Sequence, residues 1–476
     1  MKYFYKITLI ILIIFGLTRC EKREQISTEL EVQNFVWKGL NAYYLWQEDV
    51  PDLQDNRFSN QNALNDYIST QQPEELFENL LYKRDEIDKW SWIVTDYVAL
   101  EQLFAGVRKS NGMQFGLVAI SENEQQIFGY VRYVIPNSEA ASLGIHRGDI
   151  LYGINGQQLT RNNYQDLLSS ESYTVNFGTF SIANSTPNIT PNDVNIELNK
   201  EVLNINPIQL VTTYEENNHK IGYILYNQFV SNYDEQLNDA FLQLKNEGIK
   251  DLVLDLRYNG GGSVQTAVNL VSMITGQYTN ELFAKEKWNS KWQSYLEANH
   301  PEYLTNNFTD KLSNGTAINS LNLDEITILV TGNSASASEL VINGLNPYIT
   351  VNLIGTTTHG KYVGSVTLYD SDSYRKDDNT LNTNHHYAMQ PIVLEMVNKL
   401  GENEKNGFAP TSYLPEDFAN LGILGDPNEP LFRMAIDQIL GLRRPVLSKN
   451  QQLNFKPISD DGLNNPFLSN MYVDLK

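Results

Sequence analysis

The sequence predicts a mixed α/β protein with a partly parallel sheet at its centre. From residue 220 the chain alternates an apolar strand, a helix and a second apolar strand, over 221–226, 233–246 and 251–256. Later apolar runs at 326–330 and 351–354 fit two further strands of the same sheet. Such alternation is typical of layered α/β domains, in which helices cover a sheet whose strands run partly in parallel.

Two regions precede this core and differ from it in periodicity. Residues 31–100 repeat apolar side chains at three- and four-residue spacing, which predicts helices. Pro51 is expected to stop the first helix, and Pro73 to open a new turn. Residues 113–180 alternate like strands and predict a β-rich domain.

Composition excludes several classes of protein. The 476 residues include 35 basic and 57 acidic side chains, and the net charge of −22 repels nucleic-acid backbones and anionic lipid surfaces. The single cysteine, Cys20, permits no intrachain disulfide and no zinc site built on a cysteine pair. His385 and His386 are adjacent, so on a strand they point to opposite faces. We therefore expect no nucleic-acid partner, no metal and no cofactor.

The N-terminus has the pattern of an export signal. Lys2 and Lys6 precede an apolar run at 7–17, which is too short to span a bilayer as a helix. The run ends just before Cys20 and resembles the bacterial lipoprotein box, although Arg19 departs from the usual small residue. The resemblance implies an exported lipoprotein, periplasmic or at the outer membrane or cell surface, with a lipid anchor at Cys20. An uncleaved membrane anchor and an exported protein with an incidental cysteine are the alternatives.

The remaining segments complete the predicted organisation. Residues 182–217 are rich in Asn, Thr and Pro and are interpreted as a connection with short strands, 275–325 as an insertion, and residues after 441 as a tail without a clear element. The predicted order is a signal peptide (1–19), a tether (20–30), a helical N-terminal domain (31–100), a β-rich domain (101–182), an α/β core (183–441) and a C-terminal tail (442–476).

Small residues in the β-rich region recur at the spacing of a PDZ domain of the bacterial protease type. The matching positions are Ala140-Ala141, Gly144, Gly148-Asp149-Ile150, Ile154 and Asn155-Gly156. The resemblance implies that Phe115, Gly116, Leu117 and Val118 bind the C-terminal tail of a protein as an added strand, with backbone N–H groups holding its carboxylate. A β-rich spacer without a ligand is the alternative.

Two small-residue segments follow apolar strands at positions suited to chemistry. Residues 255–262 (DLRYNGGG) end in three glycines, which let backbone N–H groups approach a ligand at a strand end. A phosphate-binding loop is the alternative, although no Gly-Lys-Ser/Thr follows. Residues 331–340 (TGNSASASEL) place Ser336 at the start of a helix, where the dipole favours an oxyanion. Ser336 and Glu339 also fit a capping box, so capping is the structural alternative for this serine.

A third segment, 359–365 (HGKYVGS), completes an ordered set that resembles the C-terminal processing peptidases, also called tail-specific proteases. The resemblance implies a protease core with crotonase/ClpP-like α/β layers and a Ser–Lys dyad that cuts peptide bonds. Matched by position, the catalytic residues are the nucleophile Ser336, the general base Lys361, the oxyanion-hole donors Ala337 and Gly261 or Gly262, and the supporting Glu339.

The dyad places a physical demand on Lys361. A lysine with the ordinary pKa of about 10.4 is only about 0.04% neutral at pH 7, and a useful base needs a pKa nearer ~7. We expect desolvation to supply the shift, with Lys361 nearly buried, away from any carboxylate and within reach of Ser336. Pro347 and Ser365 stand where some family members carry an acidic residue and a glutamine, so the support of the lysine must differ. His359, expected to face solvent, offers a rival Ser–His pair.

The sequence thus favours one function and leaves two others open. The favoured hypothesis is an exported serine endopeptidase that binds the C-terminal tails of proteins through PDZ and hydrolyses peptide bonds by acyl-enzyme chemistry. Neither its physiological substrate nor its oligomeric state is indicated. One alternative is a catalytically inactive, lipid-anchored peptide-binding protein. The other is an acyl-CoA enzyme, because related α/β cores use paired N–H groups on a thioester.

Overall fold

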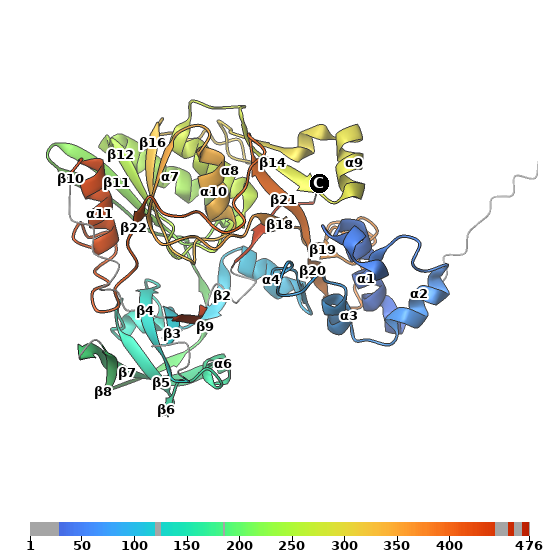
Figure 1. Ribbon diagram of the computed structural model, residues 1–476, viewed down its shortest axis with the longest axis horizontal. Helices are drawn as coiled ribbons and strands as arrows, with labels where there is room; N and C mark the ends of the chain where they lie inside the picture. The colour runs from blue at the N-terminus through green and yellow to red at the C-terminus, as the bar shows by residue number, and fades with distance from the viewer. Residues whose placement is uncertain (1–27, 120–124, 184–185, 443–455, 461–468, 476) are drawn as a thin grey trace, which may run out of the picture.

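The computed structural model describes residues 28–119, 125–183, 186–442, 456–460 and 469–475. The predicted signal peptide, Cys20 and most of the predicted tether lie outside the described residues. In the described ranges, no helix is both long and apolar enough to cross a membrane. Figure 1 shows a helical N-terminal part, a β-rich domain and an α/β core. This mixed α/β architecture confirms the predicted fold class.

The N-terminal part contains four helices and three short 3₁₀ turns. Pro73 begins a helix as predicted, but the first helix ends at Tyr43, before Pro51. The chain leaves that helix at Tyr44, whose buried hydroxyl donates to Oδ2 of Asp88 at 2.7 Å. The elements are α1 (Glu31–Tyr43), α2 (Gln61–Ile68), α3 (Pro73–Asn79) and α4 (Tyr97–Phe104), with turns at Thr28–Leu30, Gln47–Asp49 and Pro51–Leu53.

The core is a six-stranded sheet with helices on both faces (Figure 1). Its order is β10 (Ile208–Glu216), β11 (His219–Tyr226), β12 (Asp251–Asp255), β16 (Glu325–Val330), β17 (Thr350–Gly355) and β22 (Ser412–Tyr413). β10 is antiparallel to β11 and all other neighbours are parallel, as the strand–helix alternation predicts.

Side chains on the core strands alternate between two apolar clusters. Leu254 of β12 packs toward one face, and its neighbour Val253 toward the other. The first face is covered by α7 (Asp234–Glu247), α8 (Val264–Thr275) and α10 (Ala337–Leu345), and the second by α11 (Pro430–Ile439). A 3₁₀ turn at Ser231–Tyr233 leads into α7.

A second six-stranded sheet adjoins the core. Its order is β13 (Gly262–Ser263), β24 (Met471–Tyr472), β18 (Val363–Ser365), β21 (Ile392–Asn398), β14 (Leu282–Trp288) and β15 (Thr305–Asn307). The predicted insertion at 275–325 therefore supplies β14 and β15, together with α9 (Ser290–Asn299) and a 3₁₀ turn at Pro301–Leu304. A smaller sheet, β1 (Trp92–Val94), β20 (Ala388–Gln390) and β19 (Leu368–Tyr369), joins the N-terminal part to the core.

The β-rich domain extends further along the chain than the sequence pattern indicates. Its main sheet runs β23 (Lys456–Asp460), β3 (Met113–Ala119), β4 (Ile127–Val134), β5 (Ile150–Ile154), β7 (Ser172–Ala183) and β8 (Thr186–Asn199), with β6 (Gln157–Gln158) on β5. Two short helices, α5 (Glu139–Ser142) and α6 (Tyr164–Ser169), and the pair β2 (Val107–Ser110) and β9 (Glu201–Asn204) accompany it. The predicted connection at 182–217 instead contains the 14-residue β8, because β8 pairs along most of β7.

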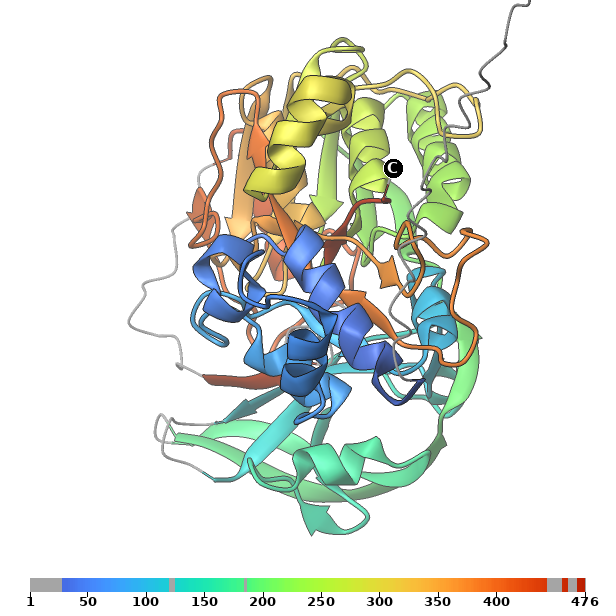
Figure 2. The same ribbon diagram turned by 90° about the vertical axis from the view of Figure 1, so that its right-hand side faces the viewer.

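The C-terminal tail forms two strands where the sequence predicts no element. β23 pairs antiparallel with β3, with Asp460 opposite Gly116. β24 lies between β13 and β18 and runs parallel to both. Figure 2 shows this end of the chain within the core. Both strands are fixed by pairing with distant segments, which no local pattern reports.

Candidate active site

Ser336 lies at the turn between β16 and α10, where the sheet meets the N-terminus of the helix. Its backbone has φ 65° and ψ −114°, a conformation that residues with a Cβ rarely adopt. The residue is fully buried, and its N–H donates to Oε2 of Glu339 at 2.9 Å. Its hydroxyl has no hydrogen-bond partner among the described residues. The capping-box arrangement that the sequence indicates is present at Ser336 and Glu339, and it holds the serine through its backbone N–H.

Lys361 lies in the loop between β17 and β18 and is 1% exposed. Burial withdraws the ammonium from water and lowers the pKa of Lys361 to about 7, although the charges of Asp88 and Glu339 oppose the shift. Its Nζ lies 5.9 Å from the centre of the Trp90 ring. Within the described part of the chain, no carboxylate forms an ion pair with it. These surroundings agree with the burial that the sequence predicts.

The predicted contact between Lys361 and the Ser336 hydroxyl is not formed. The amine donates instead to the backbone oxygen of Ser469 at 2.7 Å, because the C-terminal tail enters the cleft and offers an acceptor there. A neutral amine can make this bond as well as an ammonium, since both carry N–H donors. Proton transfer from Ser336 therefore requires the lone pair of the neutral amine to face the serine hydroxyl, which an N–H bond to the tail carbonyl does not exclude.

Glu339 joins the two loops that bear Ser336 and Lys361. Its Oε2 also accepts from the N–H of Lys361 at 2.8 Å, and its Oε1 accepts from the Thr358 hydroxyl and the Gly360 N–H, both at 2.6 Å. Burial raises the pKa of Glu339, while these donors favour its charged form. Because its bonds end on both loops, Glu339 is a positioning residue for the pair.

Backbone N–H groups surround one point beside Ser336. The N–H of Gly262 donates to the backbone oxygen of Asn470 at 2.6 Å, whereas that of Gly261 donates to Oδ1 of Asn259 at 2.9 Å. Ala337 is the first residue of α10, and its N–H has no partner among the residues that the structure describes. Of the two glycines predicted as alternatives, Gly262 therefore directs its N–H toward the tail segment beside Ser336, whereas the N–H of Gly261 is used within the glycine segment.

The structure adds side chains to the site that no motif indicates. Asp88 and Trp90 come from the N-terminal part, to which the sequence assigns no chemistry. The hydroxyl of Ser365 accepts from Nε2 of Gln390 at 3.1 Å and donates to the backbone oxygen of Met471 at 3.2 Å. The sequence carries no amide at position 365 itself. The amide of Gln390 nevertheless reaches Ser365 from strand β20. Only the paired strands bring these residues together, so spacing along the chain gives no signal for them.

The histidines differ from their predicted surroundings. His359 is half-buried rather than facing solvent, and burial with the nearby charges of Lys361 and Lys89 lowers its pKa to about 4. No hydrogen bond joins its ring to Ser336 in the described ranges. His385 lies 3.0 Å from Oδ2 of Asp370 through its Nε2. Across the described residues, no group of three or more His, Cys, Asp or Glu side chains is arranged to hold a metal ion.

A buried charge network holds the glycine segment in place. The guanidinium of Arg257 is fully buried and bonds both Asp255, at 3.0 Å, and Glu429, at 2.8 Å. Arg147 of the β-rich domain bonds Glu416 at 2.7 Å, and Glu416 lies 3.2 Å from Arg257. The opposing charges outweigh burial, raise the pKa of Arg257 and lower that of Glu416 to about 2, so these two groups are ionised at neutral pH.

The edge of β3 opposite β4 is a second candidate site. The predicted tail-binding residues 115–118 lie on this strand, and β23 pairs with it through Asp460 and Pro457 opposite Gly116 and Val118. The side chains of Phe115 and Leu117 pack in the apolar core of the β-rich domain. This edge therefore already accepts an extended segment of the chain.

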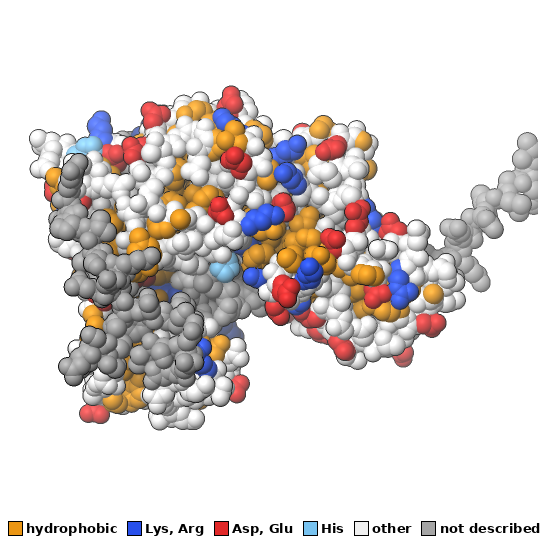
Figure 3. Space-filling model, in the orientation of Figure 1, with side chains coloured by type: hydrophobic (Ala, Val, Ile, Leu, Met, Phe, Trp, Pro, Cys, Tyr) orange, Lys and Arg blue, Asp and Glu red, His pale blue; other side chains and the backbone are white. Residues whose placement is uncertain are grey.

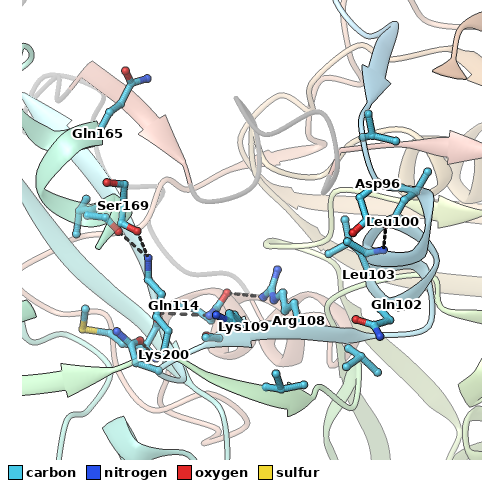
Figure 4. Close-up of a pocket in the computed structure, with 18 of the residues that line it drawn as sticks. Asp96, Leu100, Gln102, Leu103, Arg108, Lys109, Gln114, Gln165, Ser169 and Lys200 are labelled. Atoms are coloured by element: carbon cyan, nitrogen blue, oxygen red, sulfur yellow. Dashed lines mark hydrogen bonds between the residues drawn. The ribbon is translucent and has the colours of Figure 1, made fainter. Parts of the chain in front are cut away.

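A cavity of about 1050 Å³ adjoins the same edge (Figure 4). Its wall combines Phe115 and Leu117 with Tyr164 and Leu168 of α6. The basic side chains in its lining are Arg108, Lys109 and Lys200. Figure 4 shows Arg108, Lys109 and Lys200 between α6 and α4. On the face drawn in Figure 3, by contrast, acidic and basic side chains are interspersed.

The sequence and fold match known peptidases. The family model of Peptidase family S41 matches residues 220–386, and that of the Peptidase S41 N-terminal domain matches residues 31–92. The "Probable CtpA-like serine protease" of Staphylococcus aureus (strain COL) is 22% identical over 399 residues, 77% of this chain and 73% of that protein. The "Carboxyl-terminal-processing protease" of Picosynechococcus sp. is 26% identical over 227 residues, 48% of this chain and 49% of that protein.

A solved structure extends the likeness to the fold. The crystal structure described as that of a "Putative S41 protease from Bacteroides fragilis NCTC 9343" is 25% identical, covers 86% of this chain and 98% of its own, and has a TM-score of 0.66. These matches define the class of the protein as a serine-type peptidase. Within that class, the chain belongs to peptidase family S41.

Proposed function

We propose that the protein is an exported endopeptidase that binds the C-terminal tails of other proteins and cuts them with a dyad of Ser336 and Lys361. The observation that carries this proposal is a fully buried lysine with a pKa of about 7, tied through Glu339 to a serine whose hydroxyl is unpaired. At this pKa about half of the amine is neutral at pH 7, against about 0.03% for a pKa of 10.5.

The chemistry follows from the groups around Ser336. Its hydroxyl gives a proton to the neutral amine of Lys361 as the oxygen attacks a peptide carbonyl. The oxyanion that forms is placed to accept from the N–H groups of Gly262 and Ala337, at the positive end of α10. The lysine then returns the proton to the leaving amine, and water hydrolyses the acyl-serine by the reverse path.

Tail binding is assigned to a PDZ-type domain. Support comes from the edge of β3, which pairs with an added strand, β23, at the residues predicted to bind a peptide. The adjoining cavity offers apolar side chains to a peptide, and the positive charges of Arg108 and Lys200 in its lining favour a terminal carboxylate, whereas Lys109 is paired with Glu171 at 2.9 Å.

Export and lipidation at Cys20 complete the proposal and rest on the N-terminal sequence alone. Mass spectrometry of the mature N-terminus in the native host is expected to find a lipid-modified Cys20. A Cys20→Ser variant is the control, and it should lose the membrane association of the native protein. A mature native protein that begins at another residue contradicts the assignment.

Cleavage of an unfolded reporter with apolar C-terminal residues tests the enzymatic part. Ser336→Ala and Lys361→Ala should each abolish cleavage, whereas the exposed controls Ser313→Ala and Lys287→Ala should not. Circular dichroism verifies that each variant is folded. Amidation of the reporter C-terminus should weaken cleavage at least tenfold if its carboxylate is recognised.

The competing function is an inactive peptide-binding protein, favoured by the absence of the Ser336–Lys361 contact. Binding of the reporter without cleavage, by a folded wild-type protein, would decide for that function.

A further inference from the structure

The C-terminal tail of the chain lies in the candidate active site. β24 is inserted between β13, which begins at Gly262 of the glycine segment, and β18, which follows Lys361. Ser469, Asn470 and Met471 are each no more than 2% exposed. An extended segment of the chain itself is thereby packed against Lys361 and the glycine segment.

The carbonyl of Asn470 lies where a reacting carbonyl is expected. Its oxygen accepts from the N–H of Gly262 at 2.6 Å. A methyl group added at Gly261 would lie 2.4 Å from this oxygen, 2.7 Å from Cβ of Ser336 and 2.9 Å from the nitrogen of Ala337. One small space therefore brings together the carbonyl, the serine and both N–H donors of the proposed oxyanion hole.

The chain is also held on both sides of that carbonyl. On the N-terminal side, the oxygen of Ser469 accepts from Lys361 at 2.7 Å. On the C-terminal side, the backbone oxygen of Met471 accepts from the Ser365 hydroxyl at 3.2 Å, and the N–H of Val473 donates to the backbone oxygen of Ser365 at 3.1 Å. Backbone contacts on either side of one carbonyl hold a peptide in a fixed position, which is the requirement for its attack.

Apolar contacts fix the segment after the carbonyl. The side chain of Met471 is 1% exposed and belongs to the main apolar cluster of the core. The ring of Tyr472 stacks on Phe104 of α4, with 4.5 Å between centroids and 11° between planes. The register of the tail in the cleft is therefore set by side chains as well as by strand pairing.

We propose that the chain is a substrate of its own active site and that Asn470–Met471 is a self-processing site, which rests on the proposed peptidase function. The oxygen of Ser336 bonds to the carbonyl carbon of Asn470 while its proton passes to Lys361. The bond to the nitrogen of Met471 breaks as that nitrogen takes the proton, which releases the peptide 471–476. Water then hydrolyses the ester, restores the Ser336 hydroxyl and leaves Asn470 with a terminal carboxylate.

Self-processing also opens the cleft to other substrates. Before cleavage, β24 occupies the space between β13 and β18, and Ser336 has no exposed surface. After cleavage, the peptide 471–476 is held only by non-covalent contacts and can dissociate. The new C-terminal residues, Ser469 and Asn470, then lose the strand pairing of β24 and can withdraw from Lys361 and Gly262, while β23 stays paired with β3.

Intact-mass spectrometry of the full chain tests the proposal. Wild-type protein and Ser336→Ala are expressed and purified in parallel, and melting curves verify that the variant is folded. The wild type is expected to end at Asn470, and the variant to keep Lys476. A wild type that keeps Lys476, or the same truncation in both proteins, overturns self-processing.

A second readout separates this proposal from the proposed function. Both proteins are treated with a fluorophosphonate probe that reacts with activated serines, and with the unfolded reporter. A wild type that is labelled and cuts the reporter, yet keeps Lys476, removes the self-processing site while the peptidase stands. A folded wild type that is unlabelled, inactive and intact removes both. Met471→Asp places a charge in the apolar site of Met471 and should slow self-processing at least tenfold while reporter cleavage by any processed fraction continues.

Discussion

Replacing Lys361 by methionine should stabilise the protein at neutral pH, and the effect should fade as the pH rises. The folded chain holds this amine with a pKa of about 7, and the unfolded chain with its ordinary 10.5. Between these values the unfolded state binds one more proton than the folded state, so the stability of the wild type rises with pH. Integrated from pH 7 to pH 9, the free energy of unfolding of the wild type rises by roughly 2 kcal/mol. A methionine at this position does not titrate, so the variant lacks this rise.

The measurement is urea denaturation followed by tryptophan fluorescence at pH 7 and pH 9. Both proteins carry Ser336→Ala, which prevents loss of the tail during the experiment. The free energy of unfolding of Lys361→Met minus that of its parent should fall by roughly 2 kcal/mol between the two pH values. The exposed Lys287→Met is the matched control, and its difference from the parent should be nearly the same at both. An equally constant difference for Lys361→Met would refute the lowered pKa.

Three further substitutions test how the site is held. Glu339→Gln places an N–H₂ group among the donors that now face a carboxylate, so it should destabilise the protein by roughly 1–3 kcal/mol in urea and slow serine labelling at least tenfold. Gly261→Ala, at φ 113°, adds a methyl group into the cleft and should abolish labelling, whereas Gly148→Ala, at φ 93° with open space, should cost stability only. Arg257→Met removes the nearest cation from the buried carboxylate of Glu429 and should lower the unfolding free energy by roughly 3–5 kcal/mol; a loss under 1 kcal/mol contradicts the stabilising role of this ion pair.

The core of the fold was predictable because its signals are local. The strands and helix between residues 219 and 255 are each encoded by their own periodicity, and their parallel pairing follows from the alternation. The motifs single out Ser336 and Lys361 as candidates, and the chemistry proposed for the lysine demands the burial that the structure shows. The extension of the β-rich domain to include β8 was not predictable, since an Asn- and Thr-rich segment becomes a strand only through its partner β7.

The C-terminal tail is where the structure departs most from the sequence-based prediction. β24 has only two residues, and its conformation depends on β13 and β18, which flank it from far earlier in the chain. Its occupancy of the cleft also explains why the predicted hydrogen bond between Lys361 and Ser336 is replaced by one to Ser469. Asp88 and Gln390 were missed for a related reason, because tertiary packing alone places them beside the catalytic loops.

The pH dependence of Ser336 labelling by a fluorophosphonate probe tests the dyad most directly. His359, with a pKa of about 4, stays neutral above pH 5.5 and leaves Lys361 as the titrating base next to the serine. From pH 5.5 to 9, the labelling rate of the wild type should rise about tenfold per pH unit below pH ~7 and level off above it. A rate that still climbs tenfold per unit at pH 9, or a Lys361→Met variant labelled as fast as the wild type, would contradict the dyad.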